Sequence, residues 1–257
     1  MQWSILWVEL ISEQGMSIEI GEIEAIFRYP VKSMRGEPLR DAMLGWHGLD
    51  GDRRLAFRRL DERGGFPWLT AGKLPDLVLF TPQRREDGNG EGLPTHVLTP
   101  DAAEMPVFAD ALASEVGRRY GSSVQMMHLR HGVFDDGSIS VITSDTVREV
   151  GRLSGTNADV RRFRPNIVVR STRTVPFEEN EWLGGVLRFG EGNDAPAVTV
   201  TMRDARCAMV NIDPDRGSLS PEILKAIVRG NQNNAGIYGT VTRVGKLAVG
   251  QTVVLHR

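Results

Sequence analysis

The chain has 257 residues, of which 40% are hydrophobic and 25% are charged, a balance typical of a folded globular protein and not of a disordered or fibrous one. The 31 basic residues nearly balance 33 acidic ones, and the net charge of −2 excludes a global field that would attract nucleic acid or an anionic membrane. We therefore expect neither partner. The 28 glycines and 13 prolines predict many turns and short strands, which favours a β-rich protein.

The chain begins with an apolar run from Trp3 to Ile11 that contains Glu9 and is too short to span a bilayer. We expect residues 1–15 to form a disordered extension that precedes the folded part. Cys207 is the only cysteine, so no internal disulfide forms, and a reducing, cytoplasmic setting is the simplest expectation.

Period-two alternation of apolar and polar residues predicts a first strand over 18–28, which ends at Tyr29-Pro30. Further strands, each bounded by turn residues, are predicted over 54–57, 77–80, 124–127, 138–143, 166–170, 186–189, 198–202, 240–244 and 252–255. The polar, glycine-rich segment 83–94 is predicted to be an exposed loop.

Three helices are predicted among these strands. The first follows an apolar stripe at four-residue spacing, formed by Phe108, Leu112, Val116 and Tyr120. The second starts with Ser144 as its N-cap and turns Val147, Val150 and Leu153 to the core. The third has Ser220 as its N-cap, Pro221 at its first position, a face of Ile223, Leu224, Ile227 and Val228, and Gly230 past its end.

These elements predict a mainly β, barrel-rich α+β protein with few short helices. A division between Pro94 and Pro106 separates a smaller N-terminal domain, residues 16–105, from a C-terminal domain, residues 106–257.

Lys32 and Ser33 follow the first strand and offer an ammonium, a hydroxyl and backbone N–H groups, the outline of an anion cradle. The alternative is an ordinary surface turn. Arg53 and Arg54 enter the next strand and must point to opposite faces, so that one of them points inward. An inward arginine needs a phosphate or a carboxylate, and a salt bridge to Asp52 or Asp50 is the plainer solution.

The run from Arg161 to Asn166 places three arginines before a buried strand, so that a guanidinium can line a pocket, although a solvated basic turn is the alternative. Arg203 and Arg206 flank the approach to Cys207 and would favour the reactive thiolate, although a lone cysteine is often inert filler. His128 and His131 are the only histidines close in sequence, and they lack the other ligands of a zinc site.

Six short motifs occur in one order along the chain. They are 28–33 (RYPVKS), 48–53 (GLDGDR), 69–71 (LTA), 163–168 (FRPNIV), Arg206-Cys207 followed by Asp213-Pro214, and Tyr238-Gly239 before Val249-Gly250. In these motifs the sequence resembles the MOSC superfamily, named for the C-terminal domain of molybdenum cofactor sulfurases, in the arrangement with a MOSC N-terminal β-barrel domain. The mitochondrial amidoxime-reducing component and its bacterial relatives are similar to it.

The resemblance implies a molybdenum cofactor whose metal is held by two dithiolene sulfurs and by the thiolate of Cys207, the expected catalytic residue and metal ligand. It also implies that the pterin and its phosphate are bound by a set of polar side chains, namely Lys32, Ser33, Arg53, Arg164 and Asn166, with Ser144 and Tyr238 as further members. No pyridoxal phosphate is expected, because the aminotransferase-like half of the sulfurases is missing.

The implied activity is reduction of small N-hydroxylated compounds with electrons from a separate donor protein of the ferredoxin, flavin or haem type. The alternatives are a carrier or binding domain for molybdopterin or sulfur without its own turnover, and a degenerate fold with an empty pocket. Two positions depart from the family pattern: Asp204 replaces a cysteine, and Gly72 replaces an arginine on the substrate side. Asp213 and His131 are the sequence-based candidates for the general acid.

Overall fold

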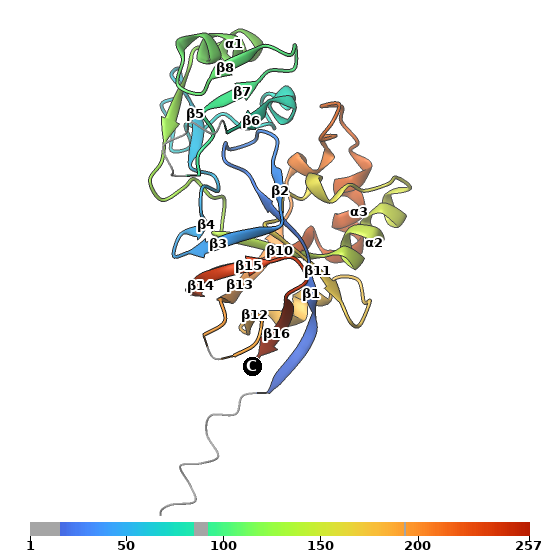
Figure 1. Cartoon of the computed structure of the whole chain (residues 1–257). Coiled ribbons are helices and arrows are strands. Elements are labelled where there is room, and N and C mark those ends of the chain that lie inside the picture. The colour runs from blue at the N-terminus through green and yellow to red at the C-terminus, as the bar shows by residue number, and fades with distance from the viewer. Residues whose placement is uncertain (1–15, 85–91, 193) are drawn as a thin grey trace, which may run out of the picture.

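The computed structural model describes residues 16–84, 92–192 and 194–257, so the predicted extension lies outside the described residues, as does most of the predicted loop over 83–94. Its centre is a closed barrel of seven strands (Figure 1). In order around the barrel these are β11 (Ile167–Ser171), β10 (Ile139–Thr143), β14 (Asn234–Arg243), β13 (Ala197–Ala205), β12 (Val186–Phe189), β16 (Thr252–His256) and β1 (Ser17–Arg28), which pairs back to β11. The mainly β prediction is confirmed.

Strand β1 closes the barrel because it changes partner along its length. Its first half pairs with β16, its middle with β11, and its last residues with β2 (Glu37–Leu39). The change occurs at Gly21, where φ is +154° and a Cβ atom would lie 2.1 Å from the carbonyl oxygen of Arg170. Only glycine fits this close approach of two backbones. The inward side chains of β1, including Ile23 and Ile26, are fully buried in the barrel core.

Two helices cover one side of the barrel (Figure 1). α2 (Ser144–Ser154) connects the parallel strands β10 and β11, and α3 (Glu222–Asn231) packs beside it. Val150, Ile223 and Ile227 bury their apolar faces between the helices and the barrel. Among the described residues no helix is long and apolar enough to cross a membrane.

A second, smaller core lies beyond one end of the barrel. It is built from α1 (Asp110–Tyr120), the 3₁₀ helix η1 (Pro75–Leu79) and short sheets, which comprise β5 (Leu55–Arg59) with β9 (Val124–His128), and β6 (Thr81–Gln83) with β7 (His96–Leu98) and β8 (Glu104–Pro106). A third small sheet joins β3 (Asp41–Gly45), β4 (Gly48–Leu49) and β15 (Gly245–Ala248). This core includes residues up to Met126 and also Ile212, and the division after residue 105 stays a prediction.

Most predicted strands are present, but the strand predicted over 77–80 is wrong. Pro75 starts η1 there, and Leu77 and Val78 are buried on that 3₁₀ turn, so the apolar run reflects burial without strand pairing. The strand predicted over 240–244 is the last part of the longer β14. Seven short strands were not predicted, because each contains at most two buried residues and so carries little apolar pattern: β2, β3, β4, β6, β7, β8 and β15.

All three helices exist, but their predicted caps need correction. Thr143, not Ser144, caps α2, because its hydroxyl accepts a hydrogen bond from the Thr146 N–H. α3 begins at Glu222 after an N-cap, Pro221, that makes no side-chain cap hydrogen bond, and Gly230 lies inside its last turn. Three residues placed on apolar faces, Phe108, Leu153 and Val228, are exposed.

Candidate functional site

A cavity of about 450 Å³ opens where the barrel meets the smaller core. Its lining comes from segments that are far apart in sequence: Lys32, Ser33 and Arg53 near the start, Thr70 and Gly72, Asp135 and Asp136 before β10, 162–164 before β11, 204–210 at the end of β13 and just after it, and Tyr238 on β14. A volume of this size suits a compact cofactor or a small ligand.

Six of the eight sequence-predicted binding residues meet in this cavity, namely Lys32, Ser33, Arg53, Arg164, Cys207 and Tyr238. Asn166 and Ser144 are not among the lining residues. Ser144 lies at the start of α2. Asn166 is fully buried, and its amide is occupied by protein groups.

The amide of Asn166 supports the cavity from behind. Its Nδ2 donates to Asp52 Oδ2 at 3.1 Å and to the Phe27 carbonyl at 3.3 Å, while its Oδ1 accepts the N–H of Ser140 at 3.1 Å. Asp52 is completely buried, accepts the Tyr29 N–H at 2.7 Å, and forms an ion pair with Arg53. The sequence analysis named Asp52 only as a salt-bridge partner, and that ion pair is confirmed.

Two guanidinium groups form a cationic wall of the cavity. Arg53 and Arg164 lie over the ring of buried Tyr29, with guanidinium carbons 5.1 Å and 4.1 Å from its centroid. Arg53 also donates to the carbonyl of Arg164 at 3.0 Å. Cation–π contacts let the ring hold both groups close together despite their like charges. Tyr29 belongs to the 28–33 motif, but the sequence assigned it no role of its own, because its role depends on this stacking.

Arg164 is incompletely paired. Its Nη1 donates to the carbonyl of Met34 at 2.7 Å, but its buried Nη2 has no hydrogen-bond partner among the described residues. Burial, reinforced by the charge of Arg53, lowers the pKa of Arg164 to about 10. A buried donor without a partner is costly, so this wall is suited to an anion that the protein does not itself supply.

Three of the lining residues adopt a backbone conformation that non-glycine residues rarely take. Ser33, Arg53 and Arg164 have φ values of +66°, +50° and +51°. Such conformations cost free energy and persist where surrounding contacts impose them, often at functional sites. All three strained residues belong to the set that sequence analysis selected.

Lys32 also lines the cavity and is almost fully buried. Its Nζ donates to Asp135 Oδ1 at 2.8 Å. Desolvation lowers the pKa of Lys32, and Asp135 offsets this only in part. Burial opposes ionisation of Asp135 as well, but the nearby ammonium outweighs it and lowers the pKa of that carboxyl.

Cys207 follows the end of β13, and its side chain is exposed at the cavity. Among the described residues no group of three histidine, cysteine or acidic side chains is arranged to hold a metal. A metal bound at Cys207 would therefore have to bring most of its ligands with it. A cofactor that carries its own sulfur ligands and a phosphate fits both the single soft thiolate and the cationic wall.

Asp204, three residues before Cys207, is the most deeply buried acid in the cavity, with 1% of its surface exposed. Its Oδ2 accepts the Ser140 hydroxyl at 3.0 Å and lies 2.8 Å from Nη2 of Arg206. Burial raises its pKa to about 6, and the charge of Arg206 limits the rise. Sequence analysis noted Asp204 only as a departure from the family pattern.

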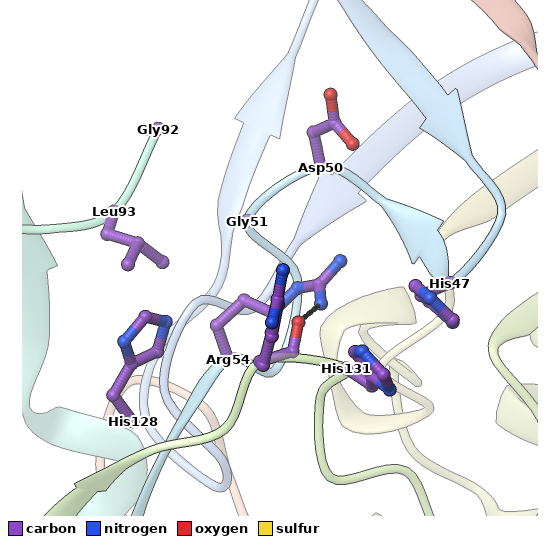
Figure 2. A pocket seen from close by; sticks show the side chains of 9 residues that line it. His47, Asp50, Gly51, Arg54, Gly92, Leu93, His128 and His131 are labelled. Atoms are coloured by element: carbon purple, nitrogen blue, oxygen red, sulfur yellow. Dashed lines mark hydrogen bonds between the residues drawn. The ribbon is translucent and has the colours of Figure 1, made fainter. Parts of the chain in front are cut away.

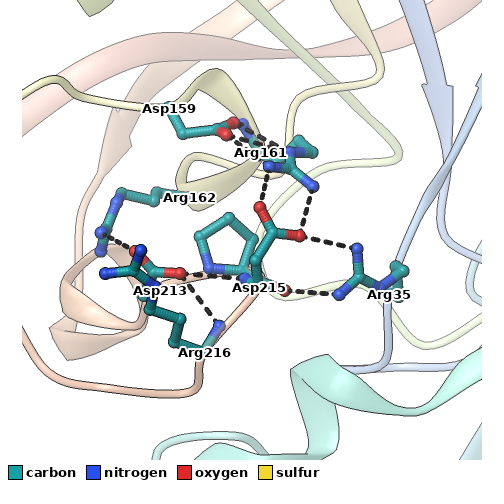
Figure 3. A network of polar contacts seen from close by, with 8 residues as sticks. Arg35, Asp159, Arg161, Arg162, Asp213, Asp215 and Arg216 are labelled. Carbon is teal, nitrogen blue, oxygen red and sulfur yellow. Dashed lines mark hydrogen bonds and ion pairs between the residues drawn. The ribbon is translucent and has the colours of Figure 1, made fainter.

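An ion cluster fastens the segment after Cys207 to the segment before β11 (Figure 3). Arg162 donates to Asp213 at 2.8 Å, and Asp215 bridges Arg161 and Arg35. Residues 160–162, which precede the buried strand β11, form a 3₁₀ helix. Asp213, a sequence-based candidate for the general acid, belongs to this cluster and does not line the cavity.

A second hollow, of about 670 Å³, lies on the other side of Arg53 and is called the recess here (Figure 2). Its side chains include Arg54 and three exposed histidines, His47, His128 and His131. The rings of His47 and His131 stack at 4.3 Å. The opposite orientation of Arg53 and Arg54 is thus confirmed, whereas the second candidate acid, His131, lies in the recess and not with Cys207.

Two family models together match residues 20–254: the MOSC N-terminal beta barrel domain over residues 20–137 and the MOSC domain over residues 128–254. The chain therefore belongs to the MOSC family, a family associated with the molybdenum cofactor.

Among solved structures the chain is similar to the YuaD protein from Bacillus subtilis, with a TM-score of 0.51 and 14% identity over 94% of this chain and 98% of that one. It also matches YiiM from Geobacillus stearothermophilus, with a TM-score of 0.37 and 20% identity over 48% of this chain and 55% of that one. No curated protein matches the sequence. The similarity to the YuaD protein shows a shared fold and nothing beyond the fold.

Proposed function

We propose that the protein is a molybdenum-cofactor enzyme that reduces small N-hydroxylated compounds, with Cys207 as the protein ligand of the metal. The observation that carries the proposal is one exposed thiol in a cavity that is also lined by Arg164, whose buried Nη2 has no partner among the residues that the structure describes. The reaction converts R–NH–OH, two protons and two electrons into R–NH₂ and water.

The bound cofactor supplies the two-electron oxygen-atom chemistry, and the protein supplies binding, orientation and protons. Arg164, Arg53, Lys32 and Ser33 would bind the phosphate and the pterin edge. Asn166 would act indirectly, because it accepts a hydrogen bond from Arg53 at 3.4 Å and also holds Asp52, the ion-pair partner of Arg53. Asp135 keeps the Lys32 ammonium in place.

Two further expectations belong to this proposal. The electrons come from a separate carrier protein of the ferredoxin, flavin or haem type, and the protein works in a reducing, cytoplasmic compartment that keeps Cys207 as a thiol.

The test is elemental analysis for molybdenum, with a pterin-fluorescence assay, on protein from a host that makes the cofactor. We expect near-stoichiometric metal and pterin in the wild type, and loss of the metal in Cys207→Ser. Molybdenum at the wild-type level in Cys207→Ser would refute the ligand role.

The loaded wild type is then assayed with a reduced viologen dye and an amidoxime or hydroxylamine. Turnover supports the reductase. A loaded protein without turnover would contradict the reductase and favour the carrier or sulfur-handling function, and a folded protein that stays empty would favour a degenerate pocket.

A further inference from the structure

The proposed reaction consumes two protons, yet neither Asp213 nor His131 lines the cavity that contains Cys207. Three carboxyl groups do line it, those of Asp135, Asp136 and Asp204. Asp135 is held as a carboxylate by Lys32, and Asp136 is exposed to solvent. Asp204 is the carboxyl group in this cavity that burial shields from water.

The contacts of Asp204 leave one of its oxygens available. The Ser140 hydroxyl and the Arg206 guanidinium both approach Oδ2. Among the described residues no hydrogen bond reaches Oδ1. The carboxyl plane is therefore fixed by Oδ2, while Oδ1 is the atom on which a proton can be held and released.

From this geometry we propose that Asp204 is the proton donor of the cavity: its Oδ1 carries a proton and delivers it to the oxygen that leaves the N-hydroxylated substrate. In this step the Oδ1–H bond and the N–O bond break, and an O–H bond forms. The leaving hydroxyl and the Asp204 proton together make water. Two electrons from the external carrier reduce the substrate, and a second proton from solvent forms the new N–H bond of the amine. The inference rests on the proposed function and assigns its acid.

The neighbours of Asp204 act in both directions on its protonation. Burial and the negative charge of Asp135 favour the protonated carboxyl, whereas Arg206, Ser140 and Arg53 favour the carboxylate. Burial dominates and places the pKa of Asp204 at about 6. Tyr238, on the neighbouring strand β14, responds to the same charge, because Asp204 adds to the effect of burial that raises the pKa of the phenol. A carboxyl group whose pKa lies near neutral pH both donates and recovers a proton readily.

The first experiment measures the protonation of Asp204 without the cofactor. The full chain is labelled with ¹³C-aspartate, and the carboxyl resonance of Asp204 is assigned by its absence in Asp204→Asn. We expect this resonance to titrate near pH 6. A carboxyl that stays ionised from pH 4.5 to 8 would overturn the inference whether or not the enzyme is active.

The second experiment measures turnover of an amidoxime by the molybdenum-loaded protein with a reduced viologen. We expect Asp204→Asn to lower kcat by about 100-fold or more, with KM and molybdenum content unchanged. The fall in kcat as the pH rises above 6 should disappear in this variant. The matched control is Asp41→Asn. Asp41 is an exposed aspartate on β3 that pairs with Lys246, and its variant should keep the wild-type pH profile.

The outcomes separate the two claims. If the loaded wild type turns over and Asp204→Asn keeps its kcat and pH profile, Asp204 is not the donor and the proposed function stands. If the loaded wild type reduces no N-hydroxylated compound, the proposed function fails and the assignment of the acid fails with it.

Discussion

The cavity and the recess lie on opposite sides of two adjacent arginines, and the smaller of the two is the better candidate site. The recess is larger, but His47, His128 and His131 are exposed in it, so water can solvate their polar groups. In the cavity, Lys32 and Asp204 are 6% and 1% exposed, and Arg164 keeps an unpartnered donor. Incomplete pairing of buried charge, and not the size of a hollow, marks the place where a ligand completes the structure.

The largest expected effect is the loss of bound pterin when the guanidinium of Arg164 is removed from the cavity. Arg164→Met deletes a charged contact to the bound cofactor, and at roughly 2–3 kcal/mol for such a contact we expect about 30- to 150-fold weaker retention of the pterin. The cofactor-free variant should be as stable as the wild type or more so, because a buried unpaired donor is replaced by an apolar side chain.

Arg54→Met, which lines the recess, is the matched control. Pterin fluorescence per protein after desalting measures retention, and thermal unfolding of the cofactor-free proteins measures stability. Equal loss of pterin in both variants would show that the recess contributes to binding as much as the cavity does.

A smaller effect is expected in the pH dependence of folding. The pKa of Asp204 is raised from 3.8 to about 6 in the folded protein, so its contribution to stability is fully present below pH 3.8. That contribution is lost as the pH rises through 6, and the loss amounts to roughly 3 kcal/mol at most.

In Asp204→Asn this part of the pH dependence should vanish, whereas Asp50→Asn in the recess should leave it intact. Urea unfolding of the cofactor-free proteins at pH 4.5 and pH 7.5 measures the difference. The same pH dependence in wild type and Asp204→Asn would contradict the assigned shift.

The smallest effect is expected at the ion cluster of Figure 3, whose bridging residue Asp215 is exposed. Hydrogen bonds from Arg161 and Arg35 lower the pKa of Asp215 to about 2, but its side chain is 52% exposed. We expect Asp215→Asn to cost less than about 1 kcal/mol near pH 7. The wild-type advantage should be present above pH 3.8 and disappear as the pH falls towards 2, as measured by denaturant unfolding. A cost of several kcal/mol would mean that the cluster anchors the Cys207 segment much more strongly than its exposure indicates.

Most of the predicted binding residues do line the cavity, because they belong to short sequence motifs near the ends of strands, which can be recognised without a structure. The alternation rule separated Arg53 from Arg54 correctly. It could not tell that the amide of Asn166 is used by Asp52, Phe27 and Ser140, since these partners come from three distant segments. The role of Asp204 was not predicted for a related reason. Its burial and its hydrogen bond with Ser140 arise only when β10 and β13 both pair with β14 in the barrel.

The fold shows the same division. Strands with a buried face were predicted, whereas the seven missed strands are mostly exposed or half-buried and are defined by pairing with a neighbour. The apolar run at Leu77 was predicted to be a strand, because a buried 3₁₀ turn and a buried strand show the same short run of apolar residues.

Closure of the barrel by β1 also bears on association between molecules. A closed sheet offers no row of unpaired backbone groups to another chain. Three strands at the margins of sheets, β2, β6 and β8, are each three residues long and contain Pro38, Pro82 and Pro106, which lack the N–H needed to extend a ladder. The architecture that holds the cavity in place thus also discourages strand-to-strand aggregation at these margins.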